Sequence, residues 1–281
     1  MNQTLSNTAL IIRRDIITMT AYAGSGHPGG SLSCTDFATV LMFHELKRDP
    51  KNPKWEGRDL LFYSNGHVTP VNYSCLAEAG YFPIRDLLKF RKLDGHLQGH
   101  PSSHDTPGIE VGSGSLGQGL SIGCGVALAA KREGSSRRVY VVNGDGELQE
   151  GMNWESIMFA AHYKLDNLVS IVDRNRKQID GDTEDIMALE PLADKWKAFG
   201  WNVIECDGHD IPAIIEAFAQ AKSHKGQPTV IIMKTVMGKG VSFMEGTHVW
   251  HGKAPSLEQV DKALHELGTS LTEWTERLKN G

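Results

Sequence analysis

Residues 139–146 read VYVVNGDG, and residues 167–175 read NLVSIVDRN. Each stretch is a short, mostly apolar run that ends in polar side chains, the pattern of a strand buried on both faces of a parallel sheet. Twenty-eight residues separate Gly146 from Asn175, enough for one helix and one strand. The two stretches therefore predict consecutive parallel strands that bring Asp145 and Asn175 together past the carboxyl edge of the sheet, where ligands bind in such folds.

The rest of the chain continues this alternation of strands and helices. Apolar runs at 60–63, 201–204 and 229–233 predict further strands. Helices are predicted at about 118–133, 154–163, 192–199 and 211–222. Fully apolar strands joined by helices are typical of a parallel sheet. We therefore predict an α/β fold, a parallel sheet with helices on both faces, in a single domain over residues 1–281, because no composition break divides the chain.

The N-terminal part predicts more helices and one long loop. An apolar stripe from Leu5 to Ala23 predicts an opening helix, which the run GSGHPGG at 24–30 should end. Further helices are expected at about 35–46, at 84–93 and after Ser256, which with Gln259 resembles a capping box. Residues 94–119 are rich in Gly, His, Pro and Ser. A loop this long in a compact domain is usually functional or disordered, and its histidines favour a function.

Composition excludes several classes of protein. The formal net charge is 29 − 34 = −5, which argues against a nucleic-acid-binding protein because such proteins carry a basic stripe. The four cysteines are far apart and form no C-x-x-C pair, as expected for reduced thiols rather than a disulfide framework. No signal core and no run of about 20 apolar residues is present, so a membrane location is not expected. We expect a cytoplasmic protein.

The two polar strand ends suggest a cation site. Asp145 offers a carboxylate and Asn175 a carboxamide, and both are hard oxygen ligands suited to Mg²⁺ or Ca²⁺. Mg²⁺ typically takes a few protein oxygens and completes its octahedron with water and phosphate oxygens. The glycines that flank Asp145 would let a diphosphate approach the backbone. Either motif alone would be read as a turn or a strand cap, but the two at this spacing favour a ligand site.

Several short blocks, in order, resemble the transketolase family. The G-D-G motif followed by Asn175 resembles the thiamine-diphosphate motif. The other blocks are SGHPGG at 25–30, SNGH at 64–67, GHP at 99–101, GSLGQG at 114–119, ELQEG at 147–151, IDG at 179–181, and GTH at 246–248 with HG at 251–252. The resemblance covers nearly the whole chain, but transketolase chains are more than twice as long. What matches is their N-terminal, diphosphate-binding (PP) domain, so the chain resembles the N-terminal subunit of a split transketolase.

The resemblance implies a set of site residues. Asp145 and Asn175 would be side-chain ligands of Mg²⁺, with Ca²⁺ as a possible substitute, and the backbone carbonyl of Lys177 would be the third protein ligand. Gly146 would meet the diphosphate of thiamine diphosphate, and Glu150 would contact a glutamate of a partner chain in a proton relay. Gly114, Ser115 and Leu116 would line the cofactor, and His67 and His251 would touch its phosphates or thiazolium ring. His27, His100 and His251 would face the hydroxyls and the carbonyl group of the sugar.

Two positions depart from the family pattern. Lys177 stands where the family usually has an aliphatic residue, so its side chain must point away from the metal. Ser115 replaces a proline that is common in full-length transketolases, which is a milder change.

The histidines also have a physical argument of their own. Four of the twelve histidines stand beside a glycine within the blocks above: His27, His67, His100 and His251. The other eight are read as structural, surface or unassigned residues. Ketol transfer needs groups that donate to a carbonyl oxygen becoming an alkoxide and accept from hydroxyls at neutral pH, and imidazole does both. The spacing of Gly112, Gly114 and Gly117 fits a dinucleotide fingerprint, but no apolar strand precedes it and no acidic residue closes a second strand.

The resulting interpretation is a subunit of a thiamine-diphosphate-dependent transketolase that moves a two-carbon ketol unit between sugar phosphates. Residues 234–281 are too few for a second α/β domain, so a separate chain with the pyrimidine-binding domain should complete the cleft, in a heterotetramer. Other readings stay open: a deoxyxylulose-phosphate-synthase-like or dihydroxyacetone-synthase-like enzyme, or a non-catalytic paralogue that binds a partner. The sequence does not name the sugar.

Overall fold

The five strands of the main sheet are all parallel, as the apolar runs predicted. The computed structural model describes residues 1–281. The strands lie in the order β1-β2-β3-β7-β6. Their bounds are Leu60–Tyr63 for β1, Val139–Gly144 for β2, Leu168–Arg174 for β3, Asn202–Asp207 for β6 and Thr229–Lys234 for β7. The predicted strand at 201–204 therefore begins one residue later and runs three residues further. The α/β class with a parallel sheet is confirmed.

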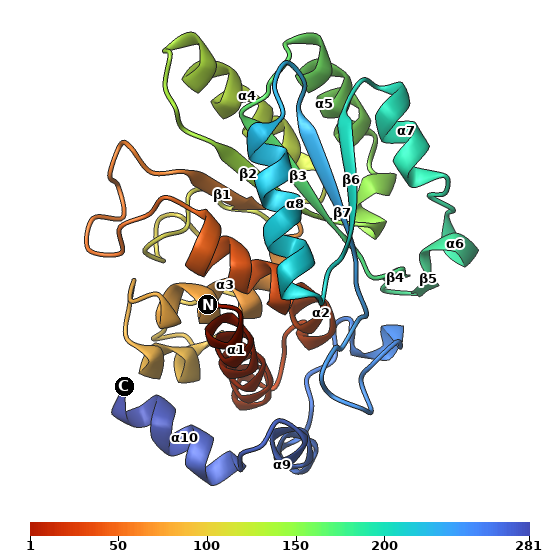
Figure 1. Ribbon diagram of the computed structural model, residues 1–281. Coiled ribbons are helices and arrows are strands. Elements are labelled where there is room, and N and C mark those ends of the chain that lie inside the picture. The colour runs from red at the N-terminus through yellow and green to blue at the C-terminus, as the bar shows by residue number, and fades with distance from the viewer.

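Helices cover both faces of this sheet (Figure 1). They are α1 (Asn2–Ala23), α2 (Pro28–Val40), α3 (Thr69–Glu78), α4 (Gln118–Arg132), α5 (Gly151–His162), α6 (Thr183–Ile186), α7 (Leu192–Ala198), α8 (Ile211–Ser223), α9 (Leu257–Glu266) and α10 (Leu271–Asn280). Figure 1 shows α8 in front of the strands. The two C-terminal helices, α9 and α10, pack against the N-terminal helix α1. None of these helices has the length and apolar character needed to cross a membrane.

Two apolar clusters fill the space on the two faces of the sheet. Successive side chains of a strand point to opposite faces. Tyr140 and Val142 of β2 accordingly join the cluster formed with α1, α2, α3 and α8, while Val139 and Val141 join the cluster formed with α4, α5 and α7. The neighbouring strands alternate in the same way. This double burial explains why the strands are apolar along their whole length.

The second helix begins earlier than predicted. The run at 24–30 does end α1, because Gly24 adopts a left-handed conformation with φ 68°. However, α2 starts at Pro28 and not near residue 35. Proline is well suited to the first helical position, where its missing N–H has no partner to lose. The helix continues into a wider turn at Leu41–Glu45.

One other predicted helix needs correction, and one short hairpin was missed. The helix expected at 84–93 is only a 3₁₀ segment, Ile84–Lys89, which ends where the backbone of Phe90 leaves helical geometry with ψ 127° and its ring is buried. A short antiparallel hairpin, β4 (Lys177–Gln178) with β5 (Gly181–Asp182), was not predicted. The capping box of Ser256 and Gln259 is confirmed. All four cysteines are free and buried.

Candidate active site

A cavity of about 310 Å³ lies past the carboxyl ends of β2 and β3. It contains most of the predicted site residues. Its lining includes Asp145, Asn175, Lys177, His27, His67, His251, Gly114, Leu116, Gly146 and Glu150. The register explains part of this convergence, because Gly144 of β2 lies beside Asp173 of β3, which places the residues that follow each strand side by side. The structure thus brings the predicted cation and diphosphate residues together with three of the four predicted histidines.

Asp145 is almost fully buried and strongly bound. Its Oδ1 accepts the backbone N–H of Gly146 at 2.8 Å, and its Oδ2 accepts the backbone N–H of Arg176 at 2.6 Å. Oδ2 also accepts a hydrogen bond from Nη1 of Arg174 at 3.0 Å, within a buried ion pair. Burial, with nearby Asp173 as the second cause, raises the pKa of Asp145 to about 7, although Arg174 opposes the shift. A divalent cation beside this carboxylate would favour its charged form.

Asn175 is held by a second buried carboxylate. Its Nδ2 donates to Asp173 at 2.9 Å and to Oγ of Ser33 at 3.2 Å, so these two contacts do not use the amide oxygen, Oδ1. That oxygen accepts the backbone N–H of Lys177 at 2.9 Å and retains a second lone pair. Asp173 was not predicted as a site residue. The signal was present, because a carboxylate two residues before Asn175 closes the same apolar strand.

The Lys177 side chain is engaged by an acidic side chain of its own hairpin. Its ammonium group forms an ion pair with the carboxylate of Asp182, across the β4–β5 hairpin. The positive charge of Lys177 is therefore neutralised within the hairpin.

The four predicted histidines form one cluster, although they come from four separate segments. The ring centroids of His27 and His67 lie 5.2 Å apart, and those of His67 and His251 lie 5.0 Å apart. His27 also lies 5.8 Å from His251 and 6.3 Å from His100. His100 is exposed and does not line the cavity, so it stands at the edge of the cluster.

Burial keeps this cluster neutral. It lowers the pKa of His27 to about 4, with His251, Arg91 and His100 as further causes. It also lowers the pKa of His67 well below the usual range, and that of His100 and His251 below their ordinary values. A neutral imidazole can donate from one nitrogen and accept at the other. The cluster can therefore both donate to and accept from a bound molecule at neutral pH.

Close backbone contacts allow these segments to meet. A Cβ on Gly29 would lie 2.8 Å from the backbone oxygen of Trp250, next to His251. A Cβ on Gly66 would lie 2.9 Å from the backbone nitrogen of Gly114. Real Cβ atoms do not approach other atoms this closely, so only glycine permits the contact at each position. Gly29 and Gly66 therefore let the segments that carry these histidines approach one another closely.

Glu147 is a further buried site residue that the sequence did not single out. Its carboxylate accepts hydrogen bonds from the hydroxyl of Ser64, from the backbone N–H of Gly117 at 2.8 Å and from that of Gly144 at 3.0 Å. Burial raises its pKa, and these donors oppose the shift. Glu147 thus fastens the loop that carries Gly114 and Leu116 to the end of β2.

The two remaining predicted residues are solvent-exposed. Glu150 precedes α5, lines the cavity and has an exposed side chain. Ser115 is exposed and does not line the cavity. His104, expected to be a structural or surface residue, is exposed.

The residues present fit a divalent cation with a diphosphate. No group of three or more His, Cys, Asp or Glu side chains is arranged to hold a metal. A cation here would therefore rely on one carboxylate, an amide oxygen and a backbone carbonyl, with the rest supplied by phosphate and water, as is typical of Mg²⁺. Buried polar atoms without a partner include Nδ1 of His27, Nδ1 of His251 and Oδ1 of Asn65, and all three residues line the cavity. Such atoms suit a polar ligand.

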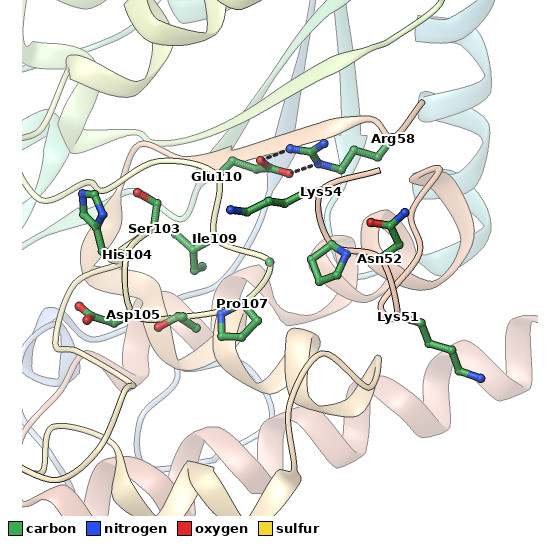
Figure 2. A pocket seen from close by; sticks show the side chains of 13 residues that line it. Lys51, Asn52, Lys54, Arg58, Ser103, His104, Asp105, Pro107, Ile109 and Glu110 are labelled. Atoms are coloured by element: carbon green, nitrogen blue, oxygen red, sulfur yellow. Dashed lines mark hydrogen bonds and ion pairs between the residues drawn. The ribbon is translucent and has the colours of Figure 1, made fainter. Parts of the chain in front are cut away.

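A larger cavity, of about 640 Å³, lies elsewhere on the surface (Figure 2). It separates residues 51–58 from residues 103–110, and the ion pair between Arg58 and Glu110 closes one wall. Apart from His104, its lining contains none of the histidines discussed above, and it contains none of the predicted site residues. We therefore place the candidate site in the smaller cavity.

Comparisons with known proteins find related sequences and structures. Residues 2–275 match the family model of the transketolase thiamine diphosphate binding domain. The chain is 45% identical to one of the subunits of apulose-4-phosphate transketolase from Actinobacillus succinogenes, over 94% of this chain and 95% of that protein. It is 42% identical to a 6-deoxy-6-sulfo-D-fructose transketolase subunit of a Clostridium species, over 94% of this chain and 96% of that protein. The structure resembles that of transketolase from Campylobacter jejuni with a TM-score of 0.92 and 36% identity, over all of this chain but only 46% of that one.

Proposed function

Because the chain belongs to the family of the transketolase thiamine diphosphate binding domain, we propose that it is the diphosphate- and Mg²⁺-binding subunit of a split transketolase. In this proposal it transfers a two-carbon ketol unit from a ketose phosphate to an aldose or aldose phosphate. One observation carries the proposal. The strand-end residues Asp145 and Asn175 share a single cavity with three members of a neutral histidine cluster.

The first part of the site would hold the cofactor. Asp145, Asn175 and the backbone carbonyl of Lys177 would bind Mg²⁺, and Gly146 would lie against the diphosphate. Gly114, Ser115 and Leu116 would line the cofactor, on the loop that Glu147 fastens through Gly117. When bound, thiamine diphosphate supplies the electron sink for breaking a carbon–carbon bond, while the protein supplies orientation and proton transfer.

The second part of the site would act on the sugar. The neutral rings of His27, His67 and His251 can donate to a carbonyl oxygen that gains negative charge and accept from hydroxyl groups. His100, at the exposed edge of the cluster, would contact the sugar nearer to solvent. Removal of water by these packed rings strengthens every such hydrogen bond.

A separate chain would complete the cleft. Glu150 is exposed at the cavity wall, where it would contact a glutamate of the partner. Exposed apolar side chains also lie there, since Leu116 is 36% exposed and Ile179 is 64% exposed. The relatives named as transketolase subunits are covered almost end to end by this chain, which supports a two-chain enzyme. We propose a heterotetramer with two copies of each chain, located in the cytoplasm.

Reconstitution tests the proposal. The chain would be purified alone and together with the product of the neighbouring gene, and ketol transfer would be measured with and without Mg²⁺ and thiamine diphosphate. Apulose 4-phosphate and 6-deoxy-6-sulfo-D-fructose, the sugars in the names of its relatives, belong among the donors tested. We expect transfer only when both chains and both cofactors are present. Robust transfer by this chain alone would contradict the split enzyme. Cofactor binding by the pair without transfer from any ketose phosphate would favour a non-catalytic or differently specific paralogue.

A further inference from the structure

Arg174 is a buried cation that connects the predicted metal ligand with a surface segment. It is the last residue of β3 and is only 4% exposed. On one side its Nη1 donates to Oδ2 of Asp145 at 3.0 Å. The same nitrogen donates to the hydroxyl of Thr183 at 2.8 Å. On the other side, Nη2 donates to Glu184 at 2.7 Å and to Glu190 at 2.8 Å.

These acceptors organise the segment from 176 to 190. The carboxylate of Glu184 in turn accepts the backbone N–H of Leu189 at 3.2 Å and that of Glu190 at 3.3 Å. At its start, the segment is fastened directly to Asp145 through the backbone N–H of Arg176. The segment includes Lys177, whose carbonyl is a predicted ligand. A single guanidinium therefore holds both Asp145 and the loop that carries the neighbouring ligand.

The contacts leave Asp145 able to take a cation. A carboxylate offers about two lone-pair directions on each oxygen. Oδ2 is occupied by two donors, Arg174 and the N–H of Arg176, whereas Oδ1 receives only the N–H of Gly146. Arg174 thus shares Oδ2 with the N–H of Arg176 and leaves one lone-pair direction of Oδ1 open.

We propose that Arg174 is a positioning residue of the site, which couples the orientation of Asp145 to the structure of segment 176–190. The proposal rests on the proposed function and adds a residue for which the comparisons give no role. Residues that orient metal ligands typically change metal affinity by 10–100-fold when they are replaced. Coupling is also reciprocal, so a cation bound at Asp145 should stabilise the segment as much as the segment stabilises the cation.

Positioning and simple charge predict opposite results. A cation next to a metal site repels the metal, so loss of the Arg174 charge alone should tighten binding. Loss of a positioning residue should weaken it. Glu184 allows a second test, because it accepts a hydrogen bond from Arg174 but contacts none of the predicted ligands, so its replacement can affect the metal only through Arg174 and the segment. Asp185 provides a matched control, since it is an exposed carboxylate one residue away that makes no ion pair or side-chain hydrogen bond.

The experiment measures Mn²⁺ binding in the presence of thiamine diphosphate by electron paramagnetic resonance, on this chain together with its partner. We expect Arg174→Met to weaken Mn²⁺ binding by about 10–100-fold and Arg174→Lys to be intermediate, because lysine keeps the charge but loses the fork. Glu184→Gln should weaken binding several-fold, and Asp185→Asn should change it less than twofold. In hydrogen exchange, Mn²⁺ with thiamine diphosphate should protect the amides of Leu189 and Glu190 in the wild type and in Asp185→Asn, but not in Arg174→Met.

The outcomes separate this inference from the proposed function. If the wild-type pair of chains bound no Mn²⁺ with thiamine diphosphate, both would be wrong. If the wild type bound Mn²⁺ and folded Arg174→Met bound it equally or more tightly, only the positioning role would be wrong. Should Arg174→Met fail to fold, equal binding by Arg174→Lys and Glu184→Gln would overturn the inference in the same way.

Discussion

The imidazole rings of His67 and His251 lie 5.0 Å apart with their planes tilted by 32°. One ring follows β1 and the other follows the loop after β7, at opposite ends of the chain's sheet-forming part. Burial and mutual repulsion keep the pKa of His67 well below its usual range, with His251 as the largest cause after burial. The close pair is therefore compatible only with rings that are mostly neutral.

The histidine cluster should make stability fall in weak acid. The pKa of His27 is lowered from 6.5 to about 4 in the folded protein. The unfolded chain therefore binds a proton that the folded chain refuses between these values, and stability is lost as pH falls from about 6.5 towards 4. At pH 5 this effect of His27 lowers the free energy of unfolding by about 2 kcal/mol relative to its value above pH 7. Urea unfolding of the wild type and of His27→Gln at pH 7.5 and pH 5 checks this, because the variant should lose less stability on acidification. Equal losses would contradict it.

Asp145→Asn should weaken cofactor binding far more than it weakens the fold. Because burial raises the pKa of Asp145 to about 7, the folded protein favours the protonated carboxyl. Above pH 7 the ionised form is costly in the absence of a cation, but the NH₂ of an amide would face either the N–H of Gly146 or the donors of Arg174 and Arg176, so the variant should lose about 1–3 kcal/mol of stability. The same change should abolish Mg²⁺-dependent binding of thiamine diphosphate. Thermal unfolding and calorimetric titration with the partner present measure the two effects, and Asn175→Ala should weaken binding less. Unchanged cofactor affinity in Asp145→Asn would remove Asp145 from the metal site.

Replacement of the clustered histidines should lower turnover with little effect on folding. His27→Ala, His100→Ala and His251→Ala each remove a donor or acceptor from the cluster, and such losses typically cost about 10²–10⁴-fold. The control is His104→Ala, an exposed histidine on the same long loop as His100. Steady-state rates of the reconstituted enzyme give the comparison. Normal turnover in all three cluster variants would exclude the proposed sugar-facing role.

Glu147 and Glu150 should behave in opposite ways although they are three residues apart. Glu147→Ala leaves the buried N–H groups of Gly117 and Gly144 without their acceptor, so it should destabilise the chain by about 2–4 kcal/mol. Glu150→Gln alters an exposed side chain and should change stability by less than about 0.5 kcal/mol, while it lowers turnover with the partner. Urea unfolding and the reconstituted assay, run on both variants, compare them. The assignment fails if Glu150→Gln is fully active or if Glu147→Ala is as stable as the wild type.

Local errors in the prediction have identifiable physical causes. The start of α2 was misplaced because Pro28 and two glycines read as helix breakers, although proline is favourable at a first helical position and Gly29 is required by its close approach to the backbone of Trp250. The segment at 84–93 kept a helical pattern but stops at Phe90, whose burial in the core outweighs the local preference. The first case is a local preference of proline that was misread, and the second is a tertiary contact that overrides local propensity.

Local pattern along the chain was enough to predict the parallel sheet and the proximity of Asp145 to Asn175. Strands buried on both faces must be apolar throughout, and the carboxyl ends of neighbouring parallel strands must meet at one edge, so local pattern and spacing were sufficient. Only the tertiary structure decided that His27, His67, His100 and His251 form one cluster, and that Glu147, Asp173 and Arg174 support the site. These contacts join segments far apart in the chain through hydrogen bonds and close backbone approaches. Their formation depends on the packing of the whole domain, which no local pattern records.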